Sequence, residues 1–149
     1  FYGFRNRADY SYDAMVFANS QYVREDTVWD ILSRKRKRSV VIGMPQTYPP
    51  KPLNGCLITS FLTPNTTCQY TYPPELKREV EGLVGEYMLD VENFRTDEKD
   101  RLLRQIYEMT ERRFKVAFNP ELGFSQFVAW EWLSKKYNSH SELVFPPFQ

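Results

Sequence analysis

The sequence predicts an α/β domain, because short apolar runs typical of buried strands alternate with longer segments of helical periodicity. A proline-rich stretch that suits neither state separates the first two apolar runs. The predicted strands are 39–44, 57–62 and 87–91, and the predicted helices are 27–33, 74–85 and 96–118. Residues 1–24 read as loop with at most a short extended piece. With 149 residues, 42% of them hydrophobic, the chain suits one folded domain over 1–149.

The first predicted helix has a clear start and a charged end. Thr27 and Asp30 have the spacing of a capping box, with Asp in place of Glu. Five consecutive cations follow at 34–38. Such a run is typical of a nucleic-acid or targeting signal, but it also suits the negative end of a helix dipole. Because a buried-strand run follows, and because the formal net charge is only +1, we interpret it as a solvated helix end and do not expect a nucleic-acid partner.

The proline-rich segment is the most distinctive loop of the sequence. Residues 45–55 contain Pro45, Pro49, Pro50, Pro52 and Gly55, so regular structure is excluded. The loop comes directly after a predicted buried strand. α/β folds place ligand-binding loops at such positions, so we expect a functional loop here.

The later helices are also marked by local signals. Pro74 suits a helix start and Gly82 or Gly85 a helix end. The longest helix is predicted to be capped by Thr96 or Asp97 and to end before Asn119. Its apolar stripe, which predicts a core-facing side, consists of Leu103, Ile106, Tyr107, Thr110, Phe114 and Ala117.

The C-terminal part is rich in aromatic residues, which make up 16% of the chain. We predict a last helix over 124–137 and an extended tail over 144–148. Clustered aromatic residues indicate either an aromatic-rich core or a protein-binding surface.

The cysteines and the apolar runs indicate where in the cell the protein is expected to reside. No apolar run approaches the length needed to cross a bilayer, so no membrane partner is expected. Cys56 and Cys68 are interpreted as free buried thiols of a cytoplasmic protein, with a disulfide between them as the alternative. The sequon at Asn65 matters only if the chain is secreted. Because the chain opens on Phe1 without an initiator Met, we expect a preceding segment or its removal.

Candidate catalytic residues are scarce. His140 is the one histidine, and it follows a predicted helix end, where a surface role is the usual one. Asp9 and Asp13 are a weak candidate metal pair in a loop. Neither a nucleophile elbow nor a phosphate-binding glycine loop occurs. The segment 3–7 offers two guanidinium groups for an anion, or simply two exposed arginines.

Several strings in order resemble the alkaline phosphatase superfamily, specifically the type I phosphodiesterase/nucleotide pyrophosphatase group. The most specific is MPQTYPPKPLNG at 44–55. The others are 3–7, 27–33, 60–64, 70–76 and 107–117. The resemblance covers 1–117, and 118–149 departs from the pattern apart from a faint likeness at 124–133.

The resemblance implies a partial alkaline-phosphatase-like sheet with flanking helices. It implies hydrolysis of phosphate esters at a two-metal site, usually zinc, by a Thr or Ser nucleophile. The nucleophile segment would precede Phe1, and the Asp-x-x-His-His and Asp-His-Gly ligand motifs expected after Ala117 are absent. No catalytic or metal-binding residue is therefore assigned. Arg5, Asn6, Arg7 and Tyr48 are the residues we expect near the substrate.

Two functions compete. The chain is predicted to be a segment of a metal-dependent phosphohydrolase that is inactive alone. Alternatively, it is a non-catalytic binding or structural subunit derived from that fold. The contacts would then come from the aromatic C-terminal part, namely Phe124, Phe127, Trp130, Trp132, Phe145 and Phe148.

Overall fold

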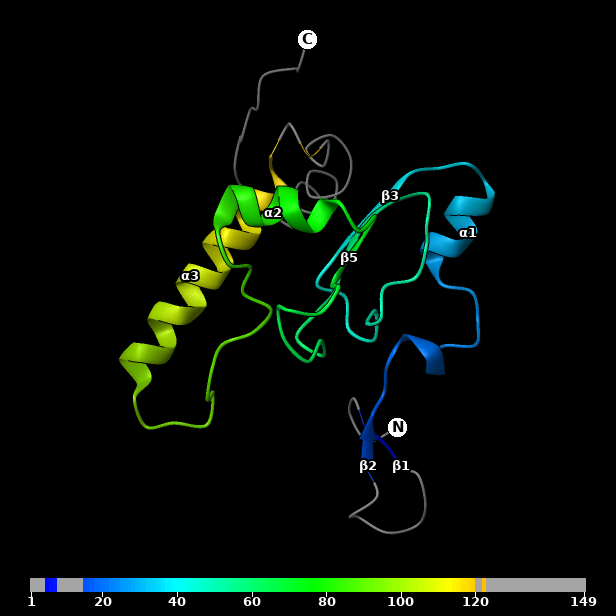
Figure 1. Cartoon of the computed structure of the whole chain (residues 1–149). Helices are drawn as coiled ribbons and strands as arrows, with labels where there is room; N and C mark the ends of the chain where they lie inside the picture. The colour runs from blue at the N-terminus through cyan, green and yellow to red at the C-terminus, as the bar shows by residue number, and fades with distance from the viewer. Residues whose placement is uncertain (1–4, 8–14, 120–121, 123–149) are drawn as a thin grey trace, which may run out of the picture.

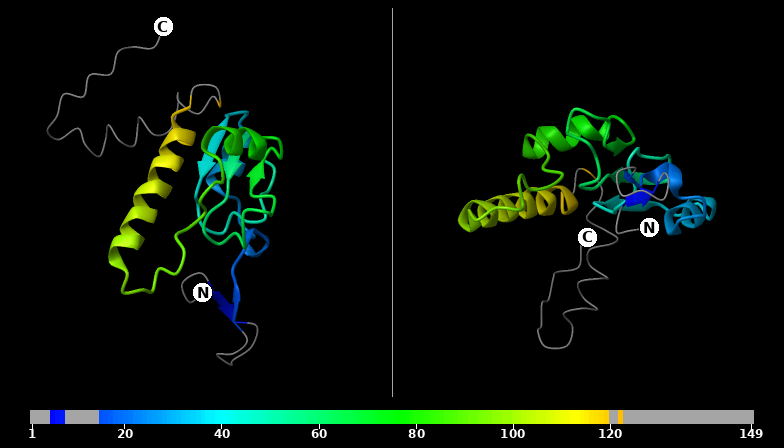
Figure 2. Two further views of the ribbon diagram at one scale, coloured as in Figure 1. Left: turned by 60° about the vertical axis from the view of Figure 1, so that its left-hand side comes forward. Right: turned by 90° about the horizontal axis from the view of Figure 1, so that it is seen from below.

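The computed structural model describes residues 5–7, 15–119 and 122. It contains a three-stranded mixed sheet with helices on both faces, and a separate two-stranded pair (Figures 1 and 2). The elements are β1 (Arg5–Arg7), β2 (Met15–Phe17), η1 (Ser20–Tyr22), α1 (Val28–Arg34), β3 (Ser39–Ile42), β4 (Gly55–Ile58), β5 (Thr71–Tyr72), α2 (Leu76–Val84) and α3 (Lys99–Ala117). The architecture confirms the predicted α/β class in its general form.

The sheet has the order β3-β4-β5, with β3 parallel to β4 and β5 antiparallel to it. Val41 lies opposite Leu57 in the parallel pair. Because side chains alternate between the two faces of a sheet, these two point to the same side. There they form a small cluster with Leu53, against which the half-buried Trp29 of α1 and Tyr72 pack.

The opposite face of the sheet carries the larger core. Its buried members are Ile58, Tyr70, Leu76, Val80, Tyr87, Leu89 and Val116. Val40, Ile42 and Cys56, which alternate with the residues of the smaller cluster, pack against it. This core joins the sheet to α2 and α3, and the rings of Tyr70 and Tyr87 stack with centroids 5.7 Å apart.

The start of α1 confirms the predicted capping box. The Thr27 hydroxyl oxygen accepts from the Asp30 N–H at 3.3 Å, and the Asp30 carboxylate accepts from the Thr27 N–H at 2.8 Å. The basic run 34–38 is exposed in the turn between α1 and β3, as expected of a solvated helix end. Arg34 forms an ion pair with Asp26 at 2.5 Å.

Gly55 begins the central strand at a point of close backbone approach. Its φ is +142°, and a Cβ there would lie 1.9 Å from the Ser39 carbonyl oxygen. Ser39 is its register partner in β3. Only glycine fits this contact, so the start of the parallel pair depends on it.

The strand predicted over 87–91 is wrong: this backbone is irregular, with a bend at 89–90. Tyr87 and Leu89 are buried in the larger core, which explains their alternating pattern. The backbone oxygens of this connection bond to arginines of α3 instead of to a strand. Arg113 donates to the Leu89 oxygen at 2.6 Å and Arg101 to the Glu92 oxygen at 3.1 Å.

Other boundaries also differ from the prediction. β4 occupies Gly55–Ile58 and not 57–62, and β5 was not predicted. Gly85, one of the two predicted helix ends, is the C-cap of α2 with φ +71°. α3 begins at Lys99 after Glu98, not at a cap formed by Thr96 or Asp97. The predicted helix 124–137 and the tail lie outside the described residues.

The face assigned to the apolar stripe of α3 is wrong. Leu103, Ile106, Tyr107 and Phe114 are all exposed, and the buried residue of the helix is Val116. The side that packs on the domain includes Leu102, Met109 and the arginines described above. Contacts between α3 and the connection that follows α2 therefore decide which side of α3 faces the domain.

Candidate ligand-binding pocket beside the proline-rich loop

The described residues form a pocket of about 230 Å³ where the chain leaves the carboxyl end of β3. Its wall comes from the start of the proline-rich loop, from the segment after η1 and from the first turn of α1. The lining residues are Ser20, Val23, Glu25, Thr27, Trp29, Asp30, Met44, Pro45, Gln46, Thr47, Lys51 and Leu57. The loop thus lies where α/β folds place ligand-binding loops, and its expected binding role stays a prediction.

η1 holds the proline-rich loop through the buried residue Ser20. The Ser20 N–H donates to the Tyr48 oxygen at 2.8 Å, and its hydroxyl donates to the Pro49 oxygen at 2.6 Å. The Lys51 ammonium donates to the Val23 oxygen at 3.4 Å. Since a proline-rich loop offers few N–H donors of its own, these contacts fix its path.

α1 braces the loop from the other side. The Asn54 N–H donates to the Ser33 hydroxyl oxygen at 2.8 Å, and that hydroxyl donates to the Trp29 oxygen at 2.7 Å. Trp29 lines the pocket and also packs against the smaller core cluster. Hydrogen bonds from η1 and from α1 therefore hold the proline-rich loop that forms part of the pocket wall.

The hydroxyl groups of the pocket are committed to internal bonds. Thr47 donates to the Met44 oxygen at 2.7 Å, and Thr27 donates to the Asp30 carboxylate at 2.5 Å. One oxygen of that carboxylate thereby belongs to the helix cap. Glu25 and Lys51 are the remaining charged groups of the lining. The arrangement can bind a small apolar body with an anionic group near Lys51, and it offers no activated nucleophile among the described residues.

Tyr48 points toward a neighbouring turn. A hydrogen bond with the Cys68 thiol is the main cause that raises the pKa of the Tyr48 phenol, and burial raises it further. The Cys68 thiol also contacts the Asn65 amide oxygen at 3.4 Å. Tyr48 is absent from the pocket lining, and its expected contact with substrate stays a prediction.

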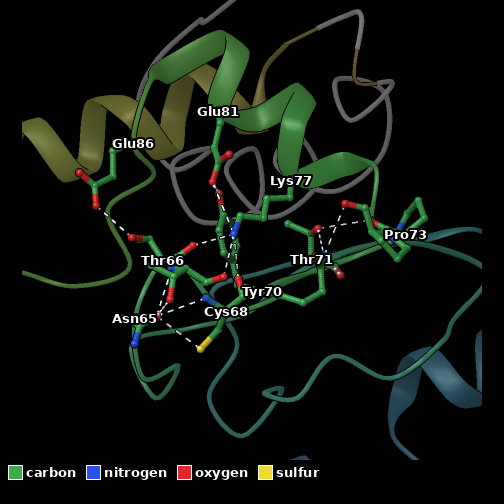
Figure 3. A network of polar contacts seen from close by, with 12 residues as sticks. Asn65, Thr66, Cys68, Tyr70, Thr71, Pro73, Lys77, Glu81 and Glu86 are labelled. Carbon is green, nitrogen blue, oxygen red and sulfur yellow. Dashed lines mark hydrogen bonds and ion pairs between the residues drawn. The ribbon is translucent and has the colours of Figure 1, made fainter.

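Lys77 of α2 anchors that turn (Figure 3). Its ammonium donates to the backbone oxygens of Thr66 at 2.7 Å, Thr67 at 3.3 Å and Cys68 at 3.0 Å. It also lies 5.1 Å from the centre of the Tyr70 ring. A chain of contacts therefore runs from α2 through the turn and Tyr48 to the proline-rich loop.

The other predicted substrate residues lie in the two-stranded pair. Arg5, Asn6 and Arg7 form β1, and Asn6 pairs with Val16 of β2. β2 leads into η1, which lines the pocket. Asp9, Asp13, His140 and the aromatic contact residues named above (Phe124, Phe127, Trp130, Trp132, Phe145 and Phe148) lie outside the described residues.

Both cysteines are free, so the alternative of a disulfide between them is wrong. They are half-buried, not fully buried as expected. Burial, opposed by Arg38, raises the pKa of the Cys56 thiol. Sequence reasoning placed the loop but missed Ser20 and Trp29, because only the tertiary fold brings these residues to it.

The zinc implied by the resemblance does not fit the described donors. Among residues 5–7, 15–119 and 122, no three His, Cys, Asp or Glu side chains lie close enough to hold a metal ion. In the pocket, the Oδ2 atom of Asp30 accepts two hydrogen bonds from Thr27, and Glu25 is the other carboxylate of the lining. No catalytic step through a metal is therefore derived from these residues.

Comparison with models of protein families, with curated proteins and with solved structures finds no match to this chain. The assignment to the phosphodiesterase group thus remains a prediction from the strings quoted above. In the part of the chain that the structure describes, no helix combines the length and the apolar character required to cross a bilayer.

Proposed function

We propose that this chain is a segment of a metal-dependent phosphohydrolase of the phosphodiesterase/nucleotide pyrophosphatase type, with a partial alkaline-phosphatase-like sheet. It contributes a wall of the substrate cleft and does not hydrolyse the substrate alone. The observation that carries the proposal is the position of 44–55. The string with the most specific resemblance walls a pocket at the carboxyl end of β3.

The composition of the pocket supports the substrate class. Trp29, Met44, Pro45 and Leu57 provide apolar surface for an organic substituent. Lys51 supplies a cation on the same lining, and a phosphodiester carries one negative charge. A phosphodiester with an aromatic substituent therefore matches both parts of the pocket.

Calorimetric titration of the whole chain with bis(p-nitrophenyl) phosphate tests the binding. We expect saturable binding that the Lys51→Gln variant weakens about tenfold, which corresponds to about 1.4 kcal/mol. Lys35→Gln is the matched control, because Lys35 is exposed in the basic turn away from the pocket lining. Equal weakening by both variants, or no binding, would contradict the proposal.

An assay of the same compound with added zinc or manganese tests the second half of the proposal. We expect no turnover above the rate of the metal ion alone. Robust metal-dependent turnover by these 149 residues would show that the chain holds a complete site, and the proposal of an inactive segment would be wrong.

A non-catalytic binding subunit is the second candidate. The observation that favours it is the exposed apolar stripe of α3, since large exposed apolar side chains in a row mark contact surfaces. A chain that neither binds the phosphodiester nor hydrolyses it, and yet associates through α3, would favour this function over the first.

A further inference from the structure

The surface of α3 is divided into three parallel stripes. At 100° per residue, one stripe faces the core and includes Leu102, Met109 and the buried Val116. A second stripe is charged and consists of Asp100, Arg104, Glu108, Glu111 and Lys115. The third is the exposed apolar stripe, namely Leu103, Ile106, Tyr107, Thr110 and Phe114, which the C-cap residue Phe118 continues.

The apolar stripe is large for a surface without a partner. Tyr107 is 74% exposed, Phe114 58% and Leu103 51%. The 19 residues of α3 give a helix about 28 Å long, and the stripe follows most of it. α3 lies at one edge of the structure and contacts α2 with its other side (Figures 1 and 2). A helix with apolar residues on two sides is typical of one packed between two neighbours.

We propose that the apolar stripe of α3 binds the same stripe of a second copy of this chain, with the two helices antiparallel. In the register that places Leu103 opposite the second copy's Phe114, Tyr107 lies opposite the second copy's Thr110. The two central pairs of the seam then each place the large Tyr107 against the small Thr110. This inference is independent of the proposed phosphodiester binding.

The charged stripe identifies the occupant and its direction. In the same register, Asp100 lies within one helical turn of the second copy's Lys115, and Arg104 within one turn of the second copy's Glu111. Opposite charges therefore face each other along the flank. The charged stripe is thus complementary to itself when the two helices run antiparallel.

Glu108 lies midway along the helix in this register, but on the side turned away from the apolar stripe, where its carboxylate pairs with Arg112 of the same helix. One helix from each chain buries a small area compared with a permanent dimer. A reversible, concentration-dependent dimer is therefore expected.

Sedimentation velocity of the whole chain over a series of concentrations tests the inference. We expect a monomer–dimer equilibrium for the unchanged chain and a monomer for Phe114→Asp. Phe94→Asp is the matched control, because Phe94 is equally exposed, at 60%, but lies outside α3. Circular dichroism confirms that each variant is folded. A monomer at every concentration, for example because residues 123–149 cover the stripe, would overturn the inference.

A charge-swap series tests the antiparallel register. Arg104→Glu places like charges opposite Glu111 at two symmetric positions and should weaken the dimer about fivefold, given surface pairs of roughly 0.5 kcal/mol each. Adding Glu111→Arg restores opposite charges and should restore the affinity. A double variant that dimerises no better than the single variant would overturn the proposed register.

Discussion

The two faces of the β3-β4-β5 sheet differ in how completely they are covered. On the side of α2 and α3, seven buried residues form a continuous core. On the side of α1, three buried residues are covered by half-buried Trp29 and Tyr72, and the pocket opens beside them. The same strands therefore carry a stabilising face and a face with room for a ligand. Substitutions on the two sides should separate stability from binding.

The largest effect on the free energy of unfolding is expected at Gly55, where β4 begins. Gly55→Ala places a methyl group against the Ser39 backbone and should lower the free energy of unfolding by more than about 4 kcal/mol, which combines overpacking with an unfavourable φ. Gly43→Ala is the control, because its φ is +67° but no atom lies within 4 Å of the added carbon. It should cost about 1 kcal/mol. Urea unfolding measures both, and equal losses would refute the close-approach argument.

Neighbouring residues of β4 compare the two faces directly. Ile58 is fully buried in the larger core, and Leu57 is 2% exposed in the smaller cluster. Ile58→Ala should cost about 4 kcal/mol, because its cavity is closed on all sides. Leu57→Ala should cost about 2 kcal/mol, because water can reach its cavity from the pocket. A larger loss for Leu57→Ala in chemical unfolding would show that the faces are misassigned.

Substitutions of two lysines separate an effect on stability from an effect on binding. Lys77→Met removes three hydrogen bonds to the turn at 66–68 and should cost about 1–3 kcal/mol, since the carbonyl groups lose their partner. Lys51→Met removes one long contact of an exposed side chain and should change stability by less than about 0.5 kcal/mol. Thermal unfolding checks both values. The expected loss for Lys51 is one of affinity, so a large loss of stability there would be unexpected.

The last comparison concerns the larger core at alkaline pH. Burial raises the pKa of the Tyr87 phenol, with Arg113 opposing, and burial followed by the Glu81 charge raises that of Tyr70. The folded state therefore favours the neutral phenols. This contribution is complete below the unfolded pKa of about 10 and is lost as pH rises above it, by up to about 1.4 kcal/mol per pH unit and group.

Denaturation curves of the unchanged chain and Tyr87→Phe between neutral and alkaline pH test this sign. The unchanged chain should lose stability above about pH 10, and the variant should lose less of it. An identical decline in both proteins would show that Tyr87 does not contribute to the loss of stability at alkaline pH.

The features predicted correctly from the sequence depend on local chemistry. The Thr27–Asp30 capping box, the Gly85 helix end and the irregular proline-rich loop need only neighbouring residues. The errors come from long-range competition. Tyr87 and Leu89 alternate as in a strand, but α3 arginines take the backbone oxygens of this connection. The apolar stripe of α3 has the pattern of a core face, yet contacts elsewhere on the helix turn it outward.

The candidate site was predictable only in part for the same reason. The proline-rich loop after β3 was expected to bind a ligand, and it lines the pocket. Ser20 and Trp29 have no local signal for such a role, because they reach the loop through the packing of η1 and α1.

The most direct test of the account is a titration of the isotope-labelled whole chain with bis(p-nitrophenyl) phosphate, followed by amide resonances. The account predicts that resonances of 44–51 and Trp29 shift together, while those of Leu76 and Val80 on the opposite face do not. Shifts centred on α2, or none at ligand concentrations that saturate the calorimetric signal, would contradict the claim that the α1 side of the sheet is the binding face.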